Sequence, residues 1–153
     1  MSSTPSPDFR RGIDHIGAGV SFVVHDGTGR VLLQKRGAGA RDEQGLWDTG
    51  GGAIEFGESF EQTLAREIRE ELCCDIIRAE FLTVYDAHRQ HNGKPTHWVQ
   101  VIYAVQVDPL AVKIGEPHKI DELGWFRSSG LPQPLHSQFH KSYDLALERG
   151  IVS

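Results

Sequence analysis

The segment from Gly52 to Cys74, which reads GAIEFGESFEQTLAREIREELCC, constrains the fold and chemistry of this chain more than any other. Ser59 is a favourable N-cap residue, and no Gly or Pro interrupts the run to Leu72, so the sequence predicts a helix there. At about 100° per residue, four apolar side chains of this helix fall on one stripe, which we expect to face a core. They are Leu64, Ala65, Ile68 and Leu72.

Glu67, Glu70 and Glu71 lie on the stripe beside these apolar residues. Carboxylates three or four residues apart on a helix repel one another by about 0.2–0.5 kcal/mol per pair. A hard divalent cation such as Mg²⁺ or Mn²⁺ prefers oxygen ligands and would remove that repulsion. Taken alone, three glutamates are as compatible with a solvated acidic face as with a metal site.

The spacing of the whole segment favours the metal site. Gly52 is followed by five residues and Glu58, then by seven residues and Arg66-Glu67, Ile68, one residue and Glu70-Glu71. This pattern matches the Nudix box position by position, so the chain resembles the Nudix hydrolases. Lys35-Arg36 and the Gly51–Ser59 segment resemble the MutT-like nucleoside triphosphate diphosphatases in particular. The resemblance runs from about Ile16 to Trp125 and is sharp only in the box.

The resemblance implies a set of site residues. The carbonyl of Gly52 and the carboxylates of Glu67, Glu70 and Glu71 would hold Mg²⁺ or Mn²⁺, and Glu70 or Glu71 would also act as a base towards water. Arg66 would orient the carboxylates, through a bidentate pair with Glu58.

Two positions depart from the family pattern. Cys73 stands where the family usually has Gly after the helix, and Gly50 stands where it often has Pro. Gly is favoured after a helix because that residue often adopts a left-handed conformation. We therefore expect strain at Cys73 or a different helix end. Neither change removes a metal ligand.

Four further candidates lie outside the box helix. Arg36 ends a predicted strand and either reaches a substrate phosphate, as the resemblance implies, or is a solvated strand end. Gly51 belongs to a run of glycines that lets backbone approach a ligand closely. Trp98 either stacks on a base or packs in the core. Glu116 lies in a loop from which, in several family members, a glutamate assists the catalytic water or binds metal.

The order of predicted elements is strand, strand, strand, helix, strand, strand, strand, helix. It predicts the α/β class with a mixed sheet in an α/β/α sandwich, which is also the Nudix fold. The main predicted strands and the last helix have these bounds: 13–25, 30–36, 80–85, 96–107 and 120–126 for strands, and 136–150 for the helix. The link 88–95 is either a cationic flap over the substrate or an exposed hairpin loop.

Length and composition bound the remaining expectations. At 153 residues the chain suits one domain, which we place at 13–153 after a flexible tail at 1–12. The net charge of −5 argues against binding to nucleic acid polymers or anionic membranes. Two adjacent cysteines form no disulfide framework, and no membrane-length apolar run or signal peptide is visible, so we expect a cytoplasmic protein. The resemblance implies a possible homodimer.

The sequence thus predicts an enzyme that hydrolyses a diphosphate linkage in a nucleotide, most simply a nucleoside triphosphate to the monophosphate and pyrophosphate. An ADP-ribose or nucleotide-sugar pyrophosphatase is the alternative substrate reading. A nucleotide-sensing Nudix module without catalysis is the alternative of another class, but this box retains every acidic residue.

Overall fold

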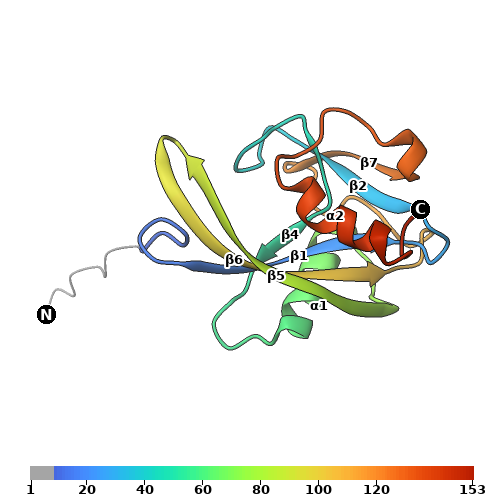
Figure 1. Ribbon diagram of the computed structural model, residues 1–153, viewed down its shortest axis with the longest axis horizontal. Helices are drawn as coiled ribbons and strands as arrows, with labels where there is room; N and C mark the ends of the chain where they lie inside the picture. The colour runs from blue at the N-terminus through green and yellow to red at the C-terminus, as the bar shows by residue number, and fades with distance from the viewer. Residues whose placement is uncertain (1–8) are drawn as a thin grey trace, which may run out of the picture.

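The computed structural model describes residues 9–153, in which a mixed sheet lies between two helices (Figure 1). The helices are α1 (Phe60–Leu72) and α2 (Phe139–Glu148), and a short 3₁₀ helix covers Ser128–Gly130. The strands are β1 (Gly17–His25), β2 (Val31–Arg36), β3 (Trp47–Asp48), β4 (Gly51–Ala53), β5 (Arg78–His91), β6 (Lys94–Gln106) and β7 (Ile120–Phe126).

The strands follow the order β3-β2-β1-β6-β5, with β4 paired to β1 and β7 paired to β2. Strands β1 and β6 run parallel along nine residue pairs, from Gly17–Trp98 to His25–Gln106, while the other pairs are antiparallel. The predicted mixed sheet is therefore confirmed.

Each face of the sheet carries its own apolar core. Alternate residues of a strand point to opposite faces, so Phe22 of β1 packs with Leu64 and Ile68 of α1, and Val23 packs with Phe139 and Tyr143 of α2. All six side chains are buried. The two helices thus cover opposite faces, which confirms the predicted α/β/α sandwich.

Helix α1 begins as predicted, and its buried face differs from the predicted stripe at one residue. Ser59 caps it, and its hydroxyl accepts the backbone N–H of Gln62 in a capping box. Ala65, expected in the apolar stripe, is exposed, and Thr63 is buried instead. The buried face of the helix thus includes Glu67 and Glu71 as well as the apolar residues. A helix rotated to bury Ala65 would turn these two carboxylates towards solvent.

The end of helix α1 shows backbone strain at Cys73, which was one of the two alternatives expected from the sequence. Cys73 adopts a left-handed conformation with φ of 58° and ψ of 29°, and its N–H donates to the carbonyl of Arg69. Cys73 thus occupies the conformation that favours glycine.

The link 88–95 belongs to a hairpin, as one of the two alternatives held, but its loop is shorter than predicted because β5 and β6 continue through most of it as an antiparallel ladder. The turn is reduced to Asn92 and Gly93, which both have positive φ, 50° and 74°. Asn-Gly is the preferred pair for such a two-residue turn, and it lets the ladder extend to His91 and Lys94. In Figure 1 this hairpin projects beyond the layer of the helices.

Residues 1–8 of the predicted tail lie outside the described part of the chain. The last predicted tail residues contact the domain: Arg11 pairs with Glu55 at 2.8 Å, and the carbonyl of Gly12 accepts the His97 N–H at 2.8 Å. No helix in residues 9–153 is long and apolar enough to cross a membrane.

Candidate active site

A cavity of about 370 Å³ opens beside α1, and we call it the carboxylate cavity. Glu67 and Glu71 are buried on its wall, whereas the Glu70 side chain is 48% exposed. Glu116 reaches the same cavity from the loop before β7. The structure therefore brings together the glutamates that the sequence singled out as metal ligands and base.

The buried glutamates are costly to ionise in the absence of a cation. Burial, the charge of Glu67 and the charge of Glu116 raise the pKa of Glu71 well above its usual value. Burial also raises the pKa of Glu67, although the nearby guanidinium of Arg66 opposes that shift. A divalent cation between these groups would reverse the balance, because an opposite charge favours the ionised carboxylates.

Arg66 holds the acidic side chains in place. Its Nε and Nη2 donate to the two carboxylate oxygens of Glu58 at 2.8 and 2.9 Å. Its Nη1 donates to Glu67 at 2.8 Å and to Glu70 at 3.4 Å, and its Nη2 also donates to the Ala53 carbonyl. The Arg66 hydrogen bonds lower the pKa of Glu58 to about 2. The arrangement matches the orienting role that the sequence predicted.

Gly52 lies directly against the glutamates. A Cβ atom at this position would fall 2.2 Å from the carboxylate of Glu67, so a larger residue would displace it. The ligand atoms that the glutamates offer to this cavity are carboxylate oxygens, and oxygen ligands fit Mg²⁺ or Mn²⁺ better than a soft metal.

The loop that carries Glu116 is fastened to the end of α1. The N–H of Lys113 donates to the carbonyl of Leu72 at 3.0 Å, and that of Gly115 donates to the carbonyl of Glu71 at 2.9 Å. This docking brings Glu116 next to a helix that lies more than 40 residues earlier in the chain.

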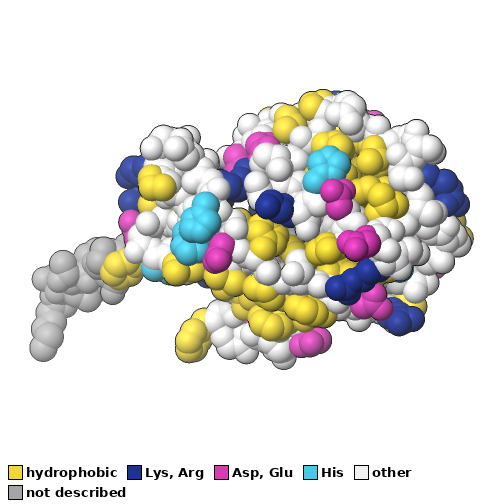
Figure 2. All heavy atoms as spheres, viewed as in Figure 1, with side chains coloured by type: hydrophobic (Ala, Val, Ile, Leu, Met, Phe, Trp, Pro, Cys, Tyr) yellow, Lys and Arg dark blue, Asp and Glu magenta, His cyan; other side chains and the backbone are white. Residues whose placement is uncertain are grey.

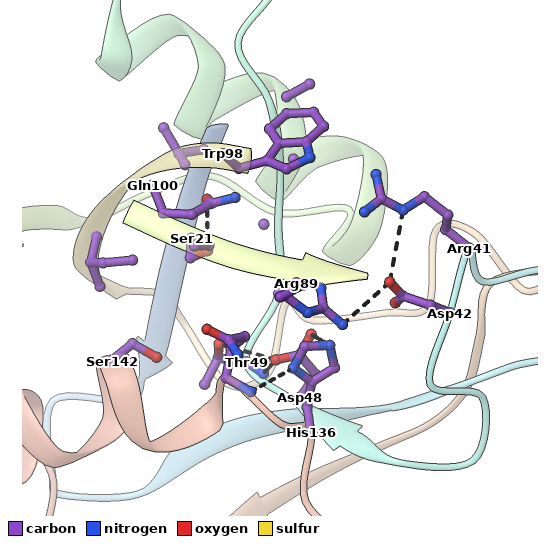
Figure 3. Close-up of a pocket in the computed structure, with 18 of the residues that line it drawn as sticks. Ser21, Arg41, Asp42, Asp48, Thr49, Arg89, Trp98, Gln100, His136 and Ser142 are labelled. Carbon is purple, nitrogen blue, oxygen red and sulfur yellow. Dashed lines mark hydrogen bonds and ion pairs between the residues drawn. The ribbon is translucent and has the colours of Figure 1, made fainter. Parts of the chain in front are cut away.

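A second cavity, of about 220 Å³, lies across β4 from the first, and we call it the arginine–tryptophan cavity (Figure 3). Trp98 and Gln100 of β6 line it together with Ser21 of β1, and Arg41 and Arg89 add positive charge. Arg36, Arg41 and the strand from Gly51 to Ala53 border both cavities. The two cavities thus form adjoining parts of one site.

Trp98 is neither a core residue nor freely exposed. Its ring is half-buried, the guanidinium of Arg41 lies 5.7 Å from the ring centroid, and the glycines at 12 and 17 have no room for a Cβ beside it. The Nε1 of Trp98 is buried without a hydrogen-bond partner among the described residues. An indole N–H that is buried usually finds a partner, but this one lies against the backbone at Gly12.

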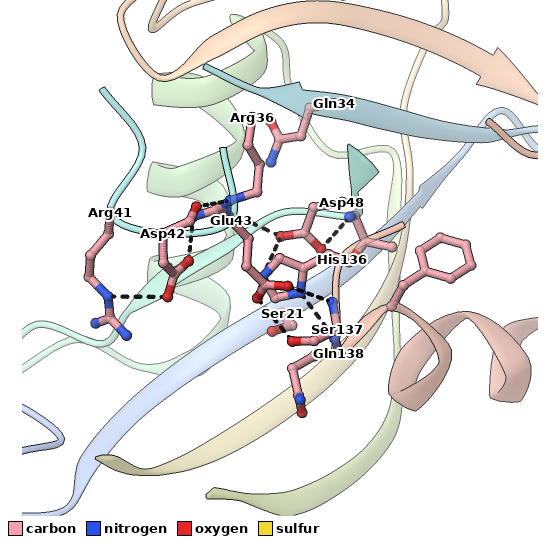
Figure 4. A network of polar contacts seen from close by, with 12 residues as sticks. Ser21, Gln34, Arg36, Arg41, Asp42, Glu43, Asp48, His136, Ser137 and Gln138 are labelled. Carbon is pink, nitrogen blue, oxygen red and sulfur yellow. Dashed lines mark hydrogen bonds and ion pairs between the residues drawn. The ribbon is translucent and has the colours of Figure 1, made fainter. Parts of the chain in front are cut away.

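Arg36 is not a solvated strand end. Its guanidinium lies in a polar network with Asp42 at 2.9 Å and Asp48 at 3.3 Å (Figure 4). Glu43 continues the network and binds Arg89 of β5 and, at 2.7 Å, the Nε2 of His136. These contacts link the loop after β2, the hairpin and the segment before α2.

Sequence reasoning missed several lining residues of both cavities. Gln34 of β2 donates to Glu71 at 3.4 Å. The change from apolar Leu33 to polar Gln34 within the predicted strand was the sequence signal that could have marked it. Arg89 lies in the link 88–95 and Arg41 lies outside the predicted strands and helices, so no periodicity marked them. His136 begins the predicted last helix, where no sequence signal indicated that it would pair with Glu43.

The comparisons with known proteins agree with this geometry. The NUDIX domain model matches residues 15–146. The chain is 38% identical over 78 residues to a CTP pyrophosphohydrolase from Escherichia coli, which is 51% of this chain and 56% of that protein. It thus spans about half the length of the curated relatives it matches first.

Two solved structures share the fold. A MutT NUDIX hydrolase from Burkholderia pseudomallei is 32% identical with a TM-score of 0.75, over 86% of this chain and 98% of that one. The NUDIX domain of Shewanella oneidensis NrtR, complexed with ADP ribose, is 25% identical with a TM-score of 0.71, over 88% of both chains. The family model, the box residues and these neighbours lead to one conclusion: the chain belongs to the Nudix family.

Proposed function

We propose that this protein hydrolyses a diphosphate linkage in a nucleoside diphosphate derivative, with Mg²⁺ or Mn²⁺ as cofactor. The observation that carries the proposal is the contact between a cavity of buried carboxylates and a cavity of arginines and tryptophan across β4. The carboxylate cavity suits cations, and the arginine–tryptophan cavity suits an aromatic base and phosphate charge.

The carboxylate cavity would hold the cofactor through Glu67, Glu70, Glu71 and the Gly52 carbonyl. A divalent cation there would neutralise phosphate oxygens and make a nearby water more acidic. Arg66 keeps Glu67 and Glu70 oriented through its hydrogen bonds. A carboxylate of this cavity, Glu70, Glu71 or Glu116, would accept the proton of the attacking water.

The arginine–tryptophan cavity would bind the nucleotide. Trp98 would stack on the base, and Gln100 and Gln138 offer amide groups that can read its edge. Arg41 would offset phosphate charge. Arg36 and Arg89 would do so after exchanging part of their pairing with the acidic residues of the network. The glycine backbone at Gly51 lets the phosphates lie close to β4.

A nucleoside triphosphate is the substrate we favour, converted to the monophosphate and pyrophosphate. The name of the Escherichia coli relative supports it. ADP-ribose is the second candidate, because the NrtR domain of comparable fold was crystallised with it. The cytoplasmic location and the homodimer stay predictions of the sequence.

The test is phosphate release with Mg²⁺ or Mn²⁺ across canonical and modified nucleoside triphosphates, ADP-ribose, a nucleotide sugar and a dinucleoside polyphosphate. Coupled pyrophosphatase and phosphatase identify the products. Metal-dependent release of pyrophosphate from a triphosphate supports the proposal. Turnover of ADP-ribose alone would mean that ADP-ribose, and not a triphosphate, is the substrate. Binding of a nucleotide without turnover of any compound would indicate a sensing module.

A further inference from the structure

Two histidines and an aspartate gather on the outer face of the β5–β6 hairpin and take no part in the proposed reaction. Asp86 and His88 lie two residues apart on β5, so they share a face, and His97 is the direct cross-strand partner of His88. Figure 2 shows histidine side chains next to an acidic one over this hairpin. The ladder register therefore brings the three side chains together.

The geometry of the three side chains suits metal coordination. Each offers one ligand atom, and these atoms all lie within 4.8 Å of one another. Nε2 of His97 and Oδ1 of Asp86 are 3.0 Å apart, and the two imidazole centroids are 4.1 Å apart with the planes tilted by 34°. Two ligands of a tetrahedral zinc ion, each about 2.0 Å from the metal, are separated by roughly 3.3 Å. Small rotamer changes would thus complete the site.

A second group of three potential ligands differs from this one in the charges around it. Asp42, Glu43 and His136 are equally close to one another, but Arg36 and Arg89 already neutralise the two carboxylates. A metal ion would have to compete with two guanidinium groups there. In the outer cluster, Asp86 pairs with His97 itself, which is a potential ligand.

We propose that Asp86, His88 and His97 form a binding site for a divalent transition-metal cation of the Zn²⁺ type. Imidazole nitrogens favour Zn²⁺ over Mg²⁺, which prefers oxygen ligands. Because Asp86 and His88 are exposed, a fourth position is open to solvent. The site is separate from the carboxylate cavity and differs from it in ligand chemistry.

The position of the cluster gives the bound metal a structural effect on the nucleotide cavity. Ala87 and Arg89 of β5 and Trp98 of β6 point to the opposite face of the hairpin, where they line the arginine–tryptophan cavity. A cation held by His88 and His97 would cross-link the two strands directly behind that wall. It would slow opening of the hairpin, whose tip projects beyond the helices.

Isothermal titration of the full, tag-free chain with Zn²⁺, in saturating Mg²⁺ to occupy the carboxylate cavity, tests the site. We expect one Zn²⁺ per chain. His88→Gln, His97→Gln or Asp86→Asn should each weaken binding at least about tenfold, and the double histidine variant should abolish it. Hydrogen exchange of the hairpin amides should slow when Zn²⁺ binds.

Two histidines serve as matched controls. His91→Gln changes the same hairpin outside the cluster, and His140→Gln removes the exposed histidine that pairs with Asp144 at 2.9 Å. Neither should alter the affinity, and Glu70→Gln should leave Zn²⁺ binding intact. Absence of a Zn²⁺ isotherm, or equal loss in the control variants, overturns the proposal. Should a histidine variant fail to fold by circular dichroism, the exposed Asp86→Asn decides, because unchanged affinity in that folded variant also overturns it.

Discussion

The carboxylate cavity and the arginine–tryptophan cavity share the wall formed by β4 but are built in opposite ways. The first takes three of its acidic residues from one helix, within five consecutive positions. The second takes its residues from β1, β6, β5, the loop after β2 and the segment before α2. Chemistry that depends on a fixed charge cluster is thus local in the sequence, whereas the surface that would select a substrate is distributed.

The two cavities also differ in how their charges are balanced. Arginine and carboxylate neutralise each other around Arg36 and Glu43, so that network is complete without a ligand. Glu67 and Glu71 are buried with only Arg66 and Gln34 as close partners among the described residues. This difference in charge balance supports our proposal of a cation in the carboxylate cavity.

Loss of a carboxylate should have the largest effect. We expect Glu70→Gln to lower kcat about 10³-fold, because it removes a proposed metal ligand and base, and to leave the fold intact, because Glu70 is half exposed. Glu61→Gln, in the exposed first turn of the same helix, is the matched control. The measurement is pyrophosphate release at saturating metal. Wild-type activity in Glu70→Gln would remove this residue from the mechanism.

Changes in the second cavity should alter binding more than the chemical step. Trp98→Ala removes a stacking surface worth about 1–3 kcal/mol per base, so we expect KM to rise about tenfold or more while kcat changes little. Trp98→Phe should retain most of the affinity. The control is Trp125→Ala, because Arg30 lies over that ring at a comparable 5.4 Å but outside both cavities. A fall in kcat without a rise in KM would contradict this and would assign Trp98 to the chemical step, as proposed for the carboxylates.

The burial of Glu71 should make the metal-free protein sensitive to pH. Since its pKa is raised in the folded state, the folded protein keeps a proton that the unfolded chain releases above about 4.5. The free energy of unfolding should therefore fall as the pH rises from there through the raised pKa. Urea denaturation with a chelator measures this fall, which should be smaller in Glu71→Gln and in wild type with Mg²⁺. An identical pH profile in the variant would show that Glu71 titrates as it does in the unfolded chain.

The end of helix α1 should give the smallest effect. Cys73 has a positive φ of 58°, which costs an L-residue about 1–2 kcal/mol, and the greater freedom of glycine in the unfolded chain offsets part of the gain. We expect Cys73→Gly to stabilise the protein by about 0.5–1 kcal/mol in urea denaturation, with activity unchanged. Cys74→Gly, which empties a buried position, should destabilise it. Destabilisation by Cys73→Gly would mean that the cysteine makes a compensating contact.

Particular residues show where sequence reasoning succeeded and where it stopped. The Ser59 cap, the mixed sheet and the two-layer helix cover follow from local pattern, because capping and periodicity depend on neighbouring residues. The burial of Ala65 and the length of the loop in 88–95 were wrong, since Thr63 is buried instead of Ala65 and a two-residue turn lets the hairpin strands extend. The role of Arg36 was left open, and its pairing with Asp42 and Asp48 depends on a loop that has no periodic signal.

The sequence by itself determined the helix that carries Glu67, Glu70 and Glu71, its cap at Ser59 and the family to which the chain belongs. These features are set by residues within a few turns of one another, so their geometry follows from the helical repeat. The tertiary structure alone decided that Glu116 joins them, that Trp98 faces a cavity and that His88 meets His97. Those neighbours are fixed by strand register and loop docking. Contacts of that kind join residues that are far apart in the sequence, so the distance between them in space cannot be inferred from their positions along the chain.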